Sequence, residues 1–258
     1  MGHFDSGIIA ERYVHHRPAV HDQVISALLT DLPASCGRQL AVDVGCGTGQ
    51  SARPLADHFA HVHAYDISEA MLAEAGSYPH VRYRLVPAEN LPDWDGCADL
   101  VISGLAFHWF DQERFLQEAW RILHPGGVLA VYNCWLAGPT VAHAPLRHWF
   151  LSDYIDRFPP PPRGGHGLLA ALDYAHPPPL HPGGSIDHHL DVSFSPHGLA
   201  RYLTTQSNIT HALDLGAELD RIDAWLEAEL ERLFHRGPME LPYRARTEWA
   251  VKPTTPTQ

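Results

Sequence analysis

The segment from Leu40 to Gln50 holds the residues whose types and spacing most directly indicate chemistry in this 258-residue sequence. An apolar run reaches Asp43, and three alternating glycines follow, Gly45, Gly47 and Gly49. Glycines after a buried strand allow a sharp turn and let a ligand approach the backbone with no Cβ in the way. The free N–H groups of the helix that such a loop opens face the ligand. The segment therefore predicts a nucleoside-cofactor site.

Two kinds of nucleoside cofactor fit this loop. Gly47-x-Gly49-x-x-Ala52 also satisfies the dinucleotide pattern, and Asp66 lies at about the spacing of a ribose-binding acid. A carboxylate at that position can accept hydrogen bonds from the ribose hydroxyls of any adenosine cofactor. Asp43 separates the two, because a carboxylate there would repel a pyrophosphate and orient an ammonium group. The residues favour a cofactor with a cationic amino-acid tail, and a nicotinamide cofactor is the alternative.

The elements that must position these residues are strands and helices, which are predicted to alternate along the chain. Ser68 and Asp111 are typical helix N-caps, and Pro125-Gly126-Gly127 is expected to end the helix that Asp111 begins. Strands are predicted over residues 40–44, 62–66, 81–86, 99–103, 128–133, 186–194 and 243–251. This alternation predicts an α/β fold with a doubly wound, mostly parallel, seven-stranded Rossmann-like sheet and a helical or loop cap inserted after strand five.

The chain is expected to form one large domain with an insertion. Residues 1–35 would form an arm and a helix that close over the cofactor, with Arg12 to Arg17 as the polar arm, and residues 36–135 the cofactor-binding core. The proline-rich residues 136–210 would form a substrate cap. Residues 211–252 would supply a helix and the last strand of the core, and residues 253–258 a tail.

Composition narrows the classes of partner. A formal net charge of −12 and a sequence pI near 5.9 argue against nucleic acid as the main partner. The four cysteines have no CxxC spacing, which favours a reducing cytoplasm. The start of the chain has no charged leader with an apolar region, and no run is long enough to cross a bilayer. We expect a soluble, cytoplasmic protein whose partner is a small molecule, with its oligomeric state left open.

Twenty histidines raise the question of a metal site. The pairs His15-His16, His61-x-His63 and His188-His189 lack acidic or cysteine partners in register, and adjacent residues on a strand point to opposite faces. No metal site is predicted from these pairs.

Five motifs in order carry a resemblance to a known family. They are Asp43–Gly49, Tyr65–Ser68, Ala88–Pro92, Ala98–Val101 and Leu123–Gly127. Together they resemble the class I S-adenosylmethionine-dependent methyltransferases over about residues 10–135. Tyr13 with Arg17-Pro18, Phe107 to Phe110, and Tyr202 to Ser207 are similar to the methyltransferase type 11 subgroup typified by trans-aconitate methyltransferase.

The chain departs from the family pattern at two places. Arg17-Pro18 is followed by Ala19-Val20-His21, where the subgroup has a tyrosine and a proline, so no role of that tyrosine is carried over. Pro87 stands where many relatives have an aspartate before the Ala-Glu pair that meets the adenine.

The resemblance implies S-adenosyl-L-methionine as cofactor and S-adenosyl-L-homocysteine as product. The cofactor-binding residues that it implies are Tyr13, Arg17, Asp43, Gly45, Gly47, Thr48, Gly49, Gln50, Asp66, Ile67, Met71, Ala88, Glu89, Ser103 and Gly104. Phe107 and Trp109 would line the mouth of the site, and Arg147 and Arg201 are further candidates for binding an acceptor.

The implied reaction is methyl transfer to a small molecule. A carboxylate oxygen is the first expectation, because a carboxylate is ionised near neutral pH and needs cations rather than a base. The alternative is an O-, N- or C-methyltransferase of secondary metabolism with His108 as general base. His108 could also serve only as a hydrogen-bond donor to a backbone carbonyl. A third hypothesis, from another class, is a protein that binds the cofactor and transfers no methyl group.

Overall fold

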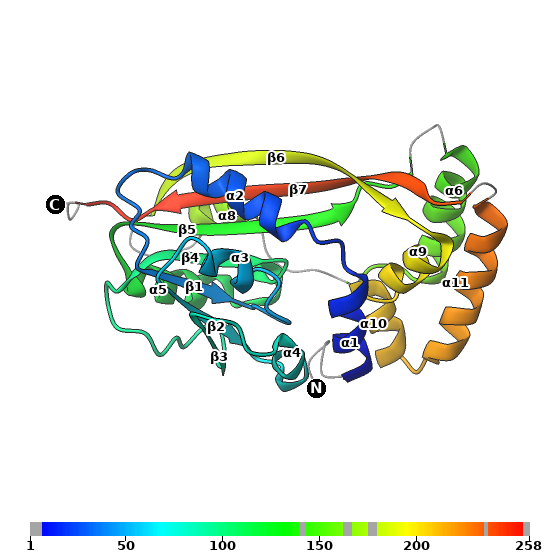
Figure 1. The fold of residues 1–258 in the computed structure, drawn as a ribbon, viewed down its shortest axis with the longest axis horizontal. Helices are drawn as coiled ribbons and strands as arrows, with labels where there is room; N and C mark the ends of the chain where they lie inside the picture. The colour runs from blue at the N-terminus through cyan, green and yellow to red at the C-terminus, as the bar shows by residue number, and fades with distance from the viewer. Residues whose placement is uncertain (1–6, 140–142, 162–166, 175–179, 235–236, 255–258) are drawn as a thin grey trace. The chain divides into compact units, whose positions relative to one another are not determined.

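The structure is a computed structural model that describes residues 7–139, 143–161, 167–174, 180–234 and 237–254 (Figure 1). The chain divides into two compact units. The sheet unit comprises Ala19–Asn133, Arg163–His188 and Ala245–Gln258, and the helical unit comprises Met1–Pro18, Cys134–Pro162 and His189–Arg244. Each unit is therefore assembled from segments that are far apart in the sequence.

A seven-stranded sheet in the order β3-β2-β1-β4-β5-β7-β6 organises the fold. Its strands are β1 (Leu40–Val44), β2 (His61–Asp66), β3 (Val81–Leu85), β4 (Ala98–Gly104), β5 (Leu123–Leu136), β6 (His181–Phe194) and β7 (Met239–Val251). The pairs β1–β2, β1–β4, β2–β3 and β4–β5 are parallel. The predicted seven-stranded, mostly parallel Rossmann-like fold is confirmed.

Strand β7 is the antiparallel member of the sheet. Gly126 N donates to the Lys252 carbonyl oxygen at 2.8 Å, and Lys252 N donates to the Gly127 carbonyl oxygen at 2.9 Å. This reciprocal pair of bonds is typical of antiparallel neighbours. The arrow of β7 accordingly points against that of β5 in Figure 1.

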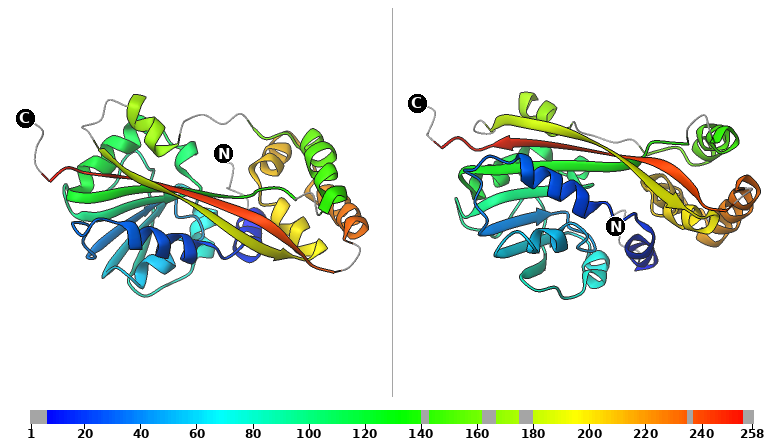
Figure 2. Two further views of the ribbon diagram at one scale, coloured as in Figure 1. Left: turned by 90° about the horizontal axis from the view of Figure 1, so that it is seen from above. Right: turned by 45° about the horizontal axis from the view of Figure 1, so that its top comes forward.

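Helices flank the sheet in the sheet unit. They are α2 (His21–Asp31), α3 (Ala52–Ala56), α4 (Glu69–Ala75), the 3₁₀ helix η1 (Phe107–Trp109), α5 (Gln112–Ile122) and α8 (Leu168–Tyr174). Figure 2 shows α2 and α5 on opposite sides of the strands. Because both faces are covered, β1 is buried from Ala41 to Val44, as expected for a central parallel strand.

Helix α5 forms where the sequence pattern predicts a helix. The Asp111 side chain accepts a hydrogen bond from Arg114 N, which confirms the predicted N-cap. Phe115, Leu116, Ala119 and Ile122 are fully buried against the sheet. The apolar stripe is therefore core, as predicted.

The predicted boundary after α5 is wrong. Pro125-Gly126-Gly127 lies inside β5 and does not precede it. Ala98 pairs with Leu123 and Leu100 with Val128, so two steps along β4 face five steps along β5. The extra residues form a local irregularity, which is how a strand accommodates proline and glycine.

The helical unit contains short helices and the ends of β5, β6 and β7. Its helices are α1 (Gly7–His16), α6 (Ala144–Trp149), the π-helix η3 (Phe150–Tyr154), α7 (Ile155–Arg157), α9 (Pro196–Leu203), α10 (Ser207–Asp214) and α11 (Leu219–Leu233). Residues 12–16 of the expected polar arm are helical and belong to α1. Arg12 donates to both carboxylate oxygens of Asp223, at 2.8 and 2.6 Å.

The two units divide the chain differently from the domain order expected from the sequence. Strand β6 begins inside the segment expected to be a cap, and α11 belongs to the helical unit. Gly164-Gly165, Pro177 to Pro179 and the end of the expected tail lie outside the described residues. Within the described parts of the chain, no helix is long and apolar enough to span a membrane.

Candidate functional site

The glycine loop follows β1 directly, at the carboxyl end of the strand. Gly45 has φ of 72°, and a Cβ there would lie 2.4 Å from the Cβ of Ala106. Gly47 has φ of 53°, and a Cβ there would have no atom within 4 Å. Both positions need glycine for their backbone conformation. The open space beside Gly47 is what a ligand lying against the backbone requires.

Asp43 lies fully buried at the start of this loop. Its Oδ2 accepts a hydrogen bond from Ser51 Oγ at 2.6 Å, whereas its buried Oδ1 has no hydrogen-bond partner among the described residues. Burial raises the pKa of Asp43 to about 7, the Ser51 hydrogen bond lowers it, and the charge of Asp66 raises it. A nearby cation would favour the ionised form of this carboxyl.

Asp66 joins the loop after β1 to the loop after β2. Its Oδ2 accepts from Gly47 N at 2.7 Å, and its Oδ1 accepts from Ser68 N at 2.8 Å. A carboxylate at this position is of the kind that accepts hydrogen bonds from ribose hydroxyls. The two bonds fix the Asp66 carboxylate between the two loops.

The residues expected to contact the adenine follow β2 and β3 in the chain. Ile67 is 74% exposed, an unusual position for a large aliphatic side chain directly after a buried strand. Met71 is buried at the start of α4, where Ser68 Oγ accepts from its backbone N–H at 3.2 Å, confirming the predicted N-cap. Ala88 is buried, and Glu89 Oε1 accepts from Asp111 N at 3.0 Å.

Two buried hydroxyls of the predicted set have no hydrogen-bond partner among the described residues. They belong to Thr48 in the glycine loop and to Ser103 near the end of β4. Gln50 lies half-buried at the end of the same loop. Buried hydroxyls in this state indicate sites where a ligand or water supplies the missing bond.

The end of β4 contains a feature that the sequence pattern missed. Leu105 has φ of 61°, a conformation that side chains other than glycine and asparagine rarely adopt. Just before it, a Cβ at Gly104 would lie 2.4 Å from the ring of Tyr132. Tyr132 Oη in turn lies 2.6 Å from Nδ1 of the buried His21. No local motif signals this arrangement, because it joins α2, β4 and β5.

The segment after Leu105 forms the 3₁₀ helix η1. Phe107 is buried and packs against Phe110 and Phe115, with ring centroids 6.3 and 5.8 Å apart, so its ring is part of the core. His108 and Trp109 are partly buried, and their ring centroids are 4.7 Å apart. The structure therefore gives Phe107 a packing role and leaves part of the other two rings accessible.

Four predicted site residues belong to the helical unit, whereas those above belong to the sheet unit. Tyr13 and Arg17 are neighbours: the Arg17 guanidinium lies 4.6 Å from the Tyr13 ring centroid. Arg201 is committed to two carboxylates, Asp223 at 2.7 Å and Glu227 at 2.8 Å. A side chain with this pairing is a poor candidate for binding an acceptor.

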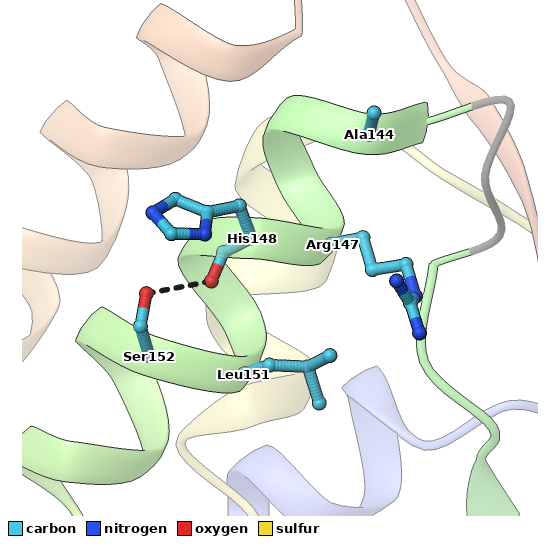
Figure 3. Close-up of a pocket in the computed structure, with 5 residues that line it drawn as sticks. All are labelled: Ala144, Arg147, His148, Leu151 and Ser152. Atoms are coloured by element: carbon cyan, nitrogen blue, oxygen red, sulfur yellow. Dashed lines mark hydrogen bonds between the residues drawn. The ribbon is translucent and has the colours of Figure 1, made fainter.

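Arg147 lines an open pocket on α6 and η3 (Figure 3). The pocket has a volume of about 250 Å³. At its wall, Ser152 Oγ donates to the His148 carbonyl oxygen at 2.7 Å. Its lining residues are Ala144, Arg147, His148, Leu151 and Ser152. In the described parts of the chain, no group of three or more His, Cys, Asp or Glu side chains is placed to hold a metal ion.

The sheet order, the glycine loop and the acid after β2 define a Rossmann-like fold of the class I methyltransferase type. A solved structure from Anaeromyxobacter dehalogenans, of a proposed type II methyltransferase, is similar with a TM-score of 0.66 and 25% identity, covering 92% of this chain and 97% of that one. Residues 42–131 match the methyltransferase domain family, over the same part of the chain whose motifs resemble the class I S-adenosylmethionine-dependent methyltransferases.

Two curated relatives each match less than half of the chain. A malonyl-[acyl-carrier protein] O-methyltransferase of Pectobacterium atrosepticum is 43% identical over 105 residues, which are 40% of this chain and 41% of that protein. A trans-aconitate 2-methyltransferase of Deinococcus radiodurans is 43% identical over 95 residues, 35% of this chain and 36% of that protein. The chain thus spans less than half the length of these relatives.

The buried carboxyl of Asp43 predicts a pH-dependent stability. Its pKa is near 7 in the folded protein and has an ordinary value of 3.8, so the fold favours the protonated form. The stability that this gives is fully present below about pH 4 and is lost as the pH rises through about 7. The difference in unfolding free energy between the wild type and Asp43→Asn should fall with pH by up to about 1.4 kcal/mol per unit.

Urea unfolding of both proteins without ligand at pH 5, 6, 7 and 8 measures this difference. Asp57→Asn, which removes an exposed carboxyl of the same unit, serves as the control variant. A wild-type minus Asp43→Asn difference that is constant across this range would show that Asp43 is ionised throughout.

Proposed function

We propose that this protein is a methyltransferase that uses S-adenosyl-L-methionine to methylate a small molecule, with a carboxylate oxygen as the first candidate acceptor. The observation that carries the proposal is the pair of acids at the glycine loop. Asp43 is a buried carboxyl with an unpaired oxygen, and Asp66 fixes the loop through Gly47 N. Two adjacent acids suit a cofactor that carries positive charge and a ribose, and oppose one that carries a pyrophosphate.

The residues at the loop fit this cofactor. Space is open beside Gly47, the Asp66 carboxylate is held at the loop by Gly47 N, and Ile67, the next residue, is exposed. When bound, S-adenosyl-L-methionine supplies a methyl group on a positively charged sulfur. In the proposed site Asp66 binds the ribose hydroxyls, and Ile67 and Met71 pack on the adenine, with Ala88 and Glu89 at its polar edge. Asp43 lowers the energy of positive charge near the loop.

The same proposal assigns the end of β4 to the reacting end of the cofactor. Ser103 and Gly104 end that strand, and the buried Ser103 hydroxyl is a donor and acceptor with no hydrogen-bond partner among the described residues. His108 and Trp109 follow four to six residues later, on η1. Their rings would border the acceptor and limit its contact with water, which helps to align it.

A carboxylate acceptor is supported by the names of the two curated relatives. One acts on a malonyl group and the other on trans-aconitate, and both names refer to carboxylic acids. A carboxylate is ionised near neutral pH, so its transfer reaction needs a cation to hold it and no general base. The second candidate is methylation of an oxygen, nitrogen or carbon that must first lose a proton, with His108 as the base.

Transfer of labelled methyl groups tests the function. The wild type, incubated with methyl-labelled S-adenosyl-L-methionine and a panel of carboxylic acids, phenols and amines, should give a labelled product with a carboxylic acid. Asp66→Asn should weaken cofactor binding by about tenfold or more, because a lost hydrogen bond to a charged group costs about 1.5–3 kcal/mol. Asp57→Asn should bind as the wild type does.

One outcome of the labelled-methyl experiment would contradict the proposal. Cofactor binding by the wild type with label in no product across the whole panel would favour a protein that binds the cofactor without transferring a methyl group. Thermal unfolding of both variants without ligand shows whether a loss of binding reflects a loss of fold.

His108→Ala separates the two acceptor classes. With a carboxylate acceptor, turnover should stay within about threefold of the wild type, because no proton has to be removed. With a base-dependent acceptor, turnover should fall by about a hundredfold or more, the usual contribution of a positioned base. A loss of that size that high pH does not restore, measured with a carboxylic acid as acceptor, would contradict the carboxylate assignment.

A further inference from the structure

Tyr132, on β5, is a fully buried tyrosine whose hydroxyl lies against the end of β4. Gly104, the last residue of β4, is its register partner in the parallel pair, and a Cβ at Gly104 would overlap Cζ and Oη of Tyr132. Tyr132 Oη lies 2.6 Å from Nδ1 of His21, the first residue of α2, which is also buried. The His21–Tyr132 hydrogen bond therefore joins α2 to the end of β4 within the sheet unit.

The turn that follows Gly104 has a strained backbone. Leu105 has φ of 61°, in the left-handed region that its side chain disfavours. Its backbone N–H donates to the Tyr132 carbonyl oxygen at 2.8 Å, so the main chain and the ring of Tyr132 both contact this turn. Strained residues persist where the surrounding contacts fix them, and they cluster at binding and catalytic sites. Tyr132 is thus the residue that holds the Gly104–Leu105 turn.

The same turn packs against the glycine loop. A Cβ at Gly45 would overlap the Cβ of Ala106, the residue after Leu105, and would lie 3.1 Å from Cζ of Phe110. Ala106 also begins η1, because its carbonyl oxygen accepts a hydrogen bond from Trp109 N at 2.8 Å. Protein interiors are close-packed, so a shift of the turn moves Ala106 relative to Gly45. The conformation of Leu105 therefore sets how η1 meets the loop after β1.

The hydroxyl of Tyr132 has a part in this arrangement that the ring alone would not have. A buried tyrosine hydroxyl needs a hydrogen-bond partner, and His21 supplies one. The oxygen that bonds to His21 is also an atom that lies against Gly104, so the bond fixes the ring at its contact with the turn. His21 lies in the segment in which the chain departs from the subgroup pattern, so that pattern does not include this pair.

From these contacts we infer that His21 and Tyr132 are a positioning pair for cofactor binding. Their hydrogen bond holds the strained Gly104–Leu105 turn in the conformation that sets η1 against the glycine loop. The inference rests on the proposed function, which takes that loop as the cofactor site. Both side chains are buried, so they act through the backbone of the turn and not by contact with the reacting atoms.

A double-mutant cycle tests the pair, with calorimetric titration of S-adenosyl-L-homocysteine as the readout. Tyr132→Phe and His21→Leu should each weaken binding by about five- to tenfold, because one hydrogen bond can favour the binding conformation by no more than its own strength. The double variant should lose no more than either single variant, since each removes the same bond. His21→Gln keeps an acceptor for the hydroxyl and should retain more affinity than His21→Leu.

Hydrogen exchange of the backbone amides, measured without ligand by mass spectrometry, gives a second readout. Peptides that cover residues 104–110 should exchange faster in Tyr132→Phe than in the wild type, whereas peptides from α5 should exchange at the wild-type rate. A purely structural role of the pair would lower the unfolding temperature and leave the affinity of the folded protein for S-adenosyl-L-homocysteine unchanged. Thermal unfolding shows which variants are folded.

His63→Leu is the matched control. It removes another histidine hydrogen bond of the sheet unit, in which His63 Nδ1 lies 2.6 Å from Asp93 Oδ1. This bond has the same length as the one between His21 and Tyr132, and it does not involve the turn after β4. The control variant should bind S-adenosyl-L-homocysteine within about twofold of the wild type, because distant sites act independently.

The inference is overturned if the wild type binds S-adenosyl-L-homocysteine and the folded Tyr132→Phe variant binds it equally well, or if the two single losses add in the double variant. Failure of the proposed function has a different signature, because the wild type then binds neither S-adenosyl-L-methionine nor S-adenosyl-L-homocysteine. The role in cofactor binding falls with it in that case. Exchange over residues 104–110 then decides alone whether the pair holds the turn, and an unchanged rate in Tyr132→Phe rejects that as well.

Discussion

The Asp66 carboxylate is the interaction on which the candidate site depends. By accepting from Gly47 N and Ser68 N, it fixes the loop after β1 against the loop after β2. The parallel register of β1 and β2 puts both loops at the same edge of the sheet, so one side chain reaches both. The loop after β1 needs glycine at its positions of positive φ. Helix α4, which begins shortly after Asp66, needs Ser68 as its N-cap. The site is thus built from backbone geometry before any ligand is considered.

Charge then decides what such a site can hold. Asp43 is fully buried, and its pKa is raised by that burial and also by the charge of Asp66. A site with two acids at one loop is unfavourable for a pyrophosphate and favourable for a cation. The protein therefore presents an acidic loop at the carboxyl end of β1.

Much of the sheet unit could be predicted from sequence, because its signals are local. The run from Leu40 to Gly49 predicts both a strand and the turn that follows it. The apolar stripe that begins at Phe115 follows helical spacing, and Asp111 is the N-cap of that helix. The boundary predicted after α5 is wrong, because Pro125 lies in an irregular part of β5 and not in a turn before that strand. The partner of Arg12 in the first segment, Asp223, is 211 residues away, so no local pattern indicates it.

The residues that sequence could not predict are those set by distant partners. Leu105 adopts a conformation that its residue type disfavours, beside a ring from β5, and the His21–Tyr132 contact joins α2 to that strand. Arg201 looks like a free cation in sequence and is paired with Asp223 in the structure, whereas Arg17 donates to the Thr205 carbonyl oxygen. Which arginine has a carboxylate beside it depends on packing, and spacing along the chain does not report it.

Equilibrium binding to the whole chain tests most directly whether the glycine loop holds a sulfonium nucleoside or a dinucleotide. Calorimetric titration near pH 8, where Asp43 is mostly ionised, compares S-adenosyl-L-methionine with NAD⁺. The account predicts saturable binding of S-adenosyl-L-methionine with a one-to-one stoichiometry and at least a hundredfold weaker binding of NAD⁺. Binding of NAD⁺ as tight as, or tighter than, that of S-adenosyl-L-methionine would contradict it.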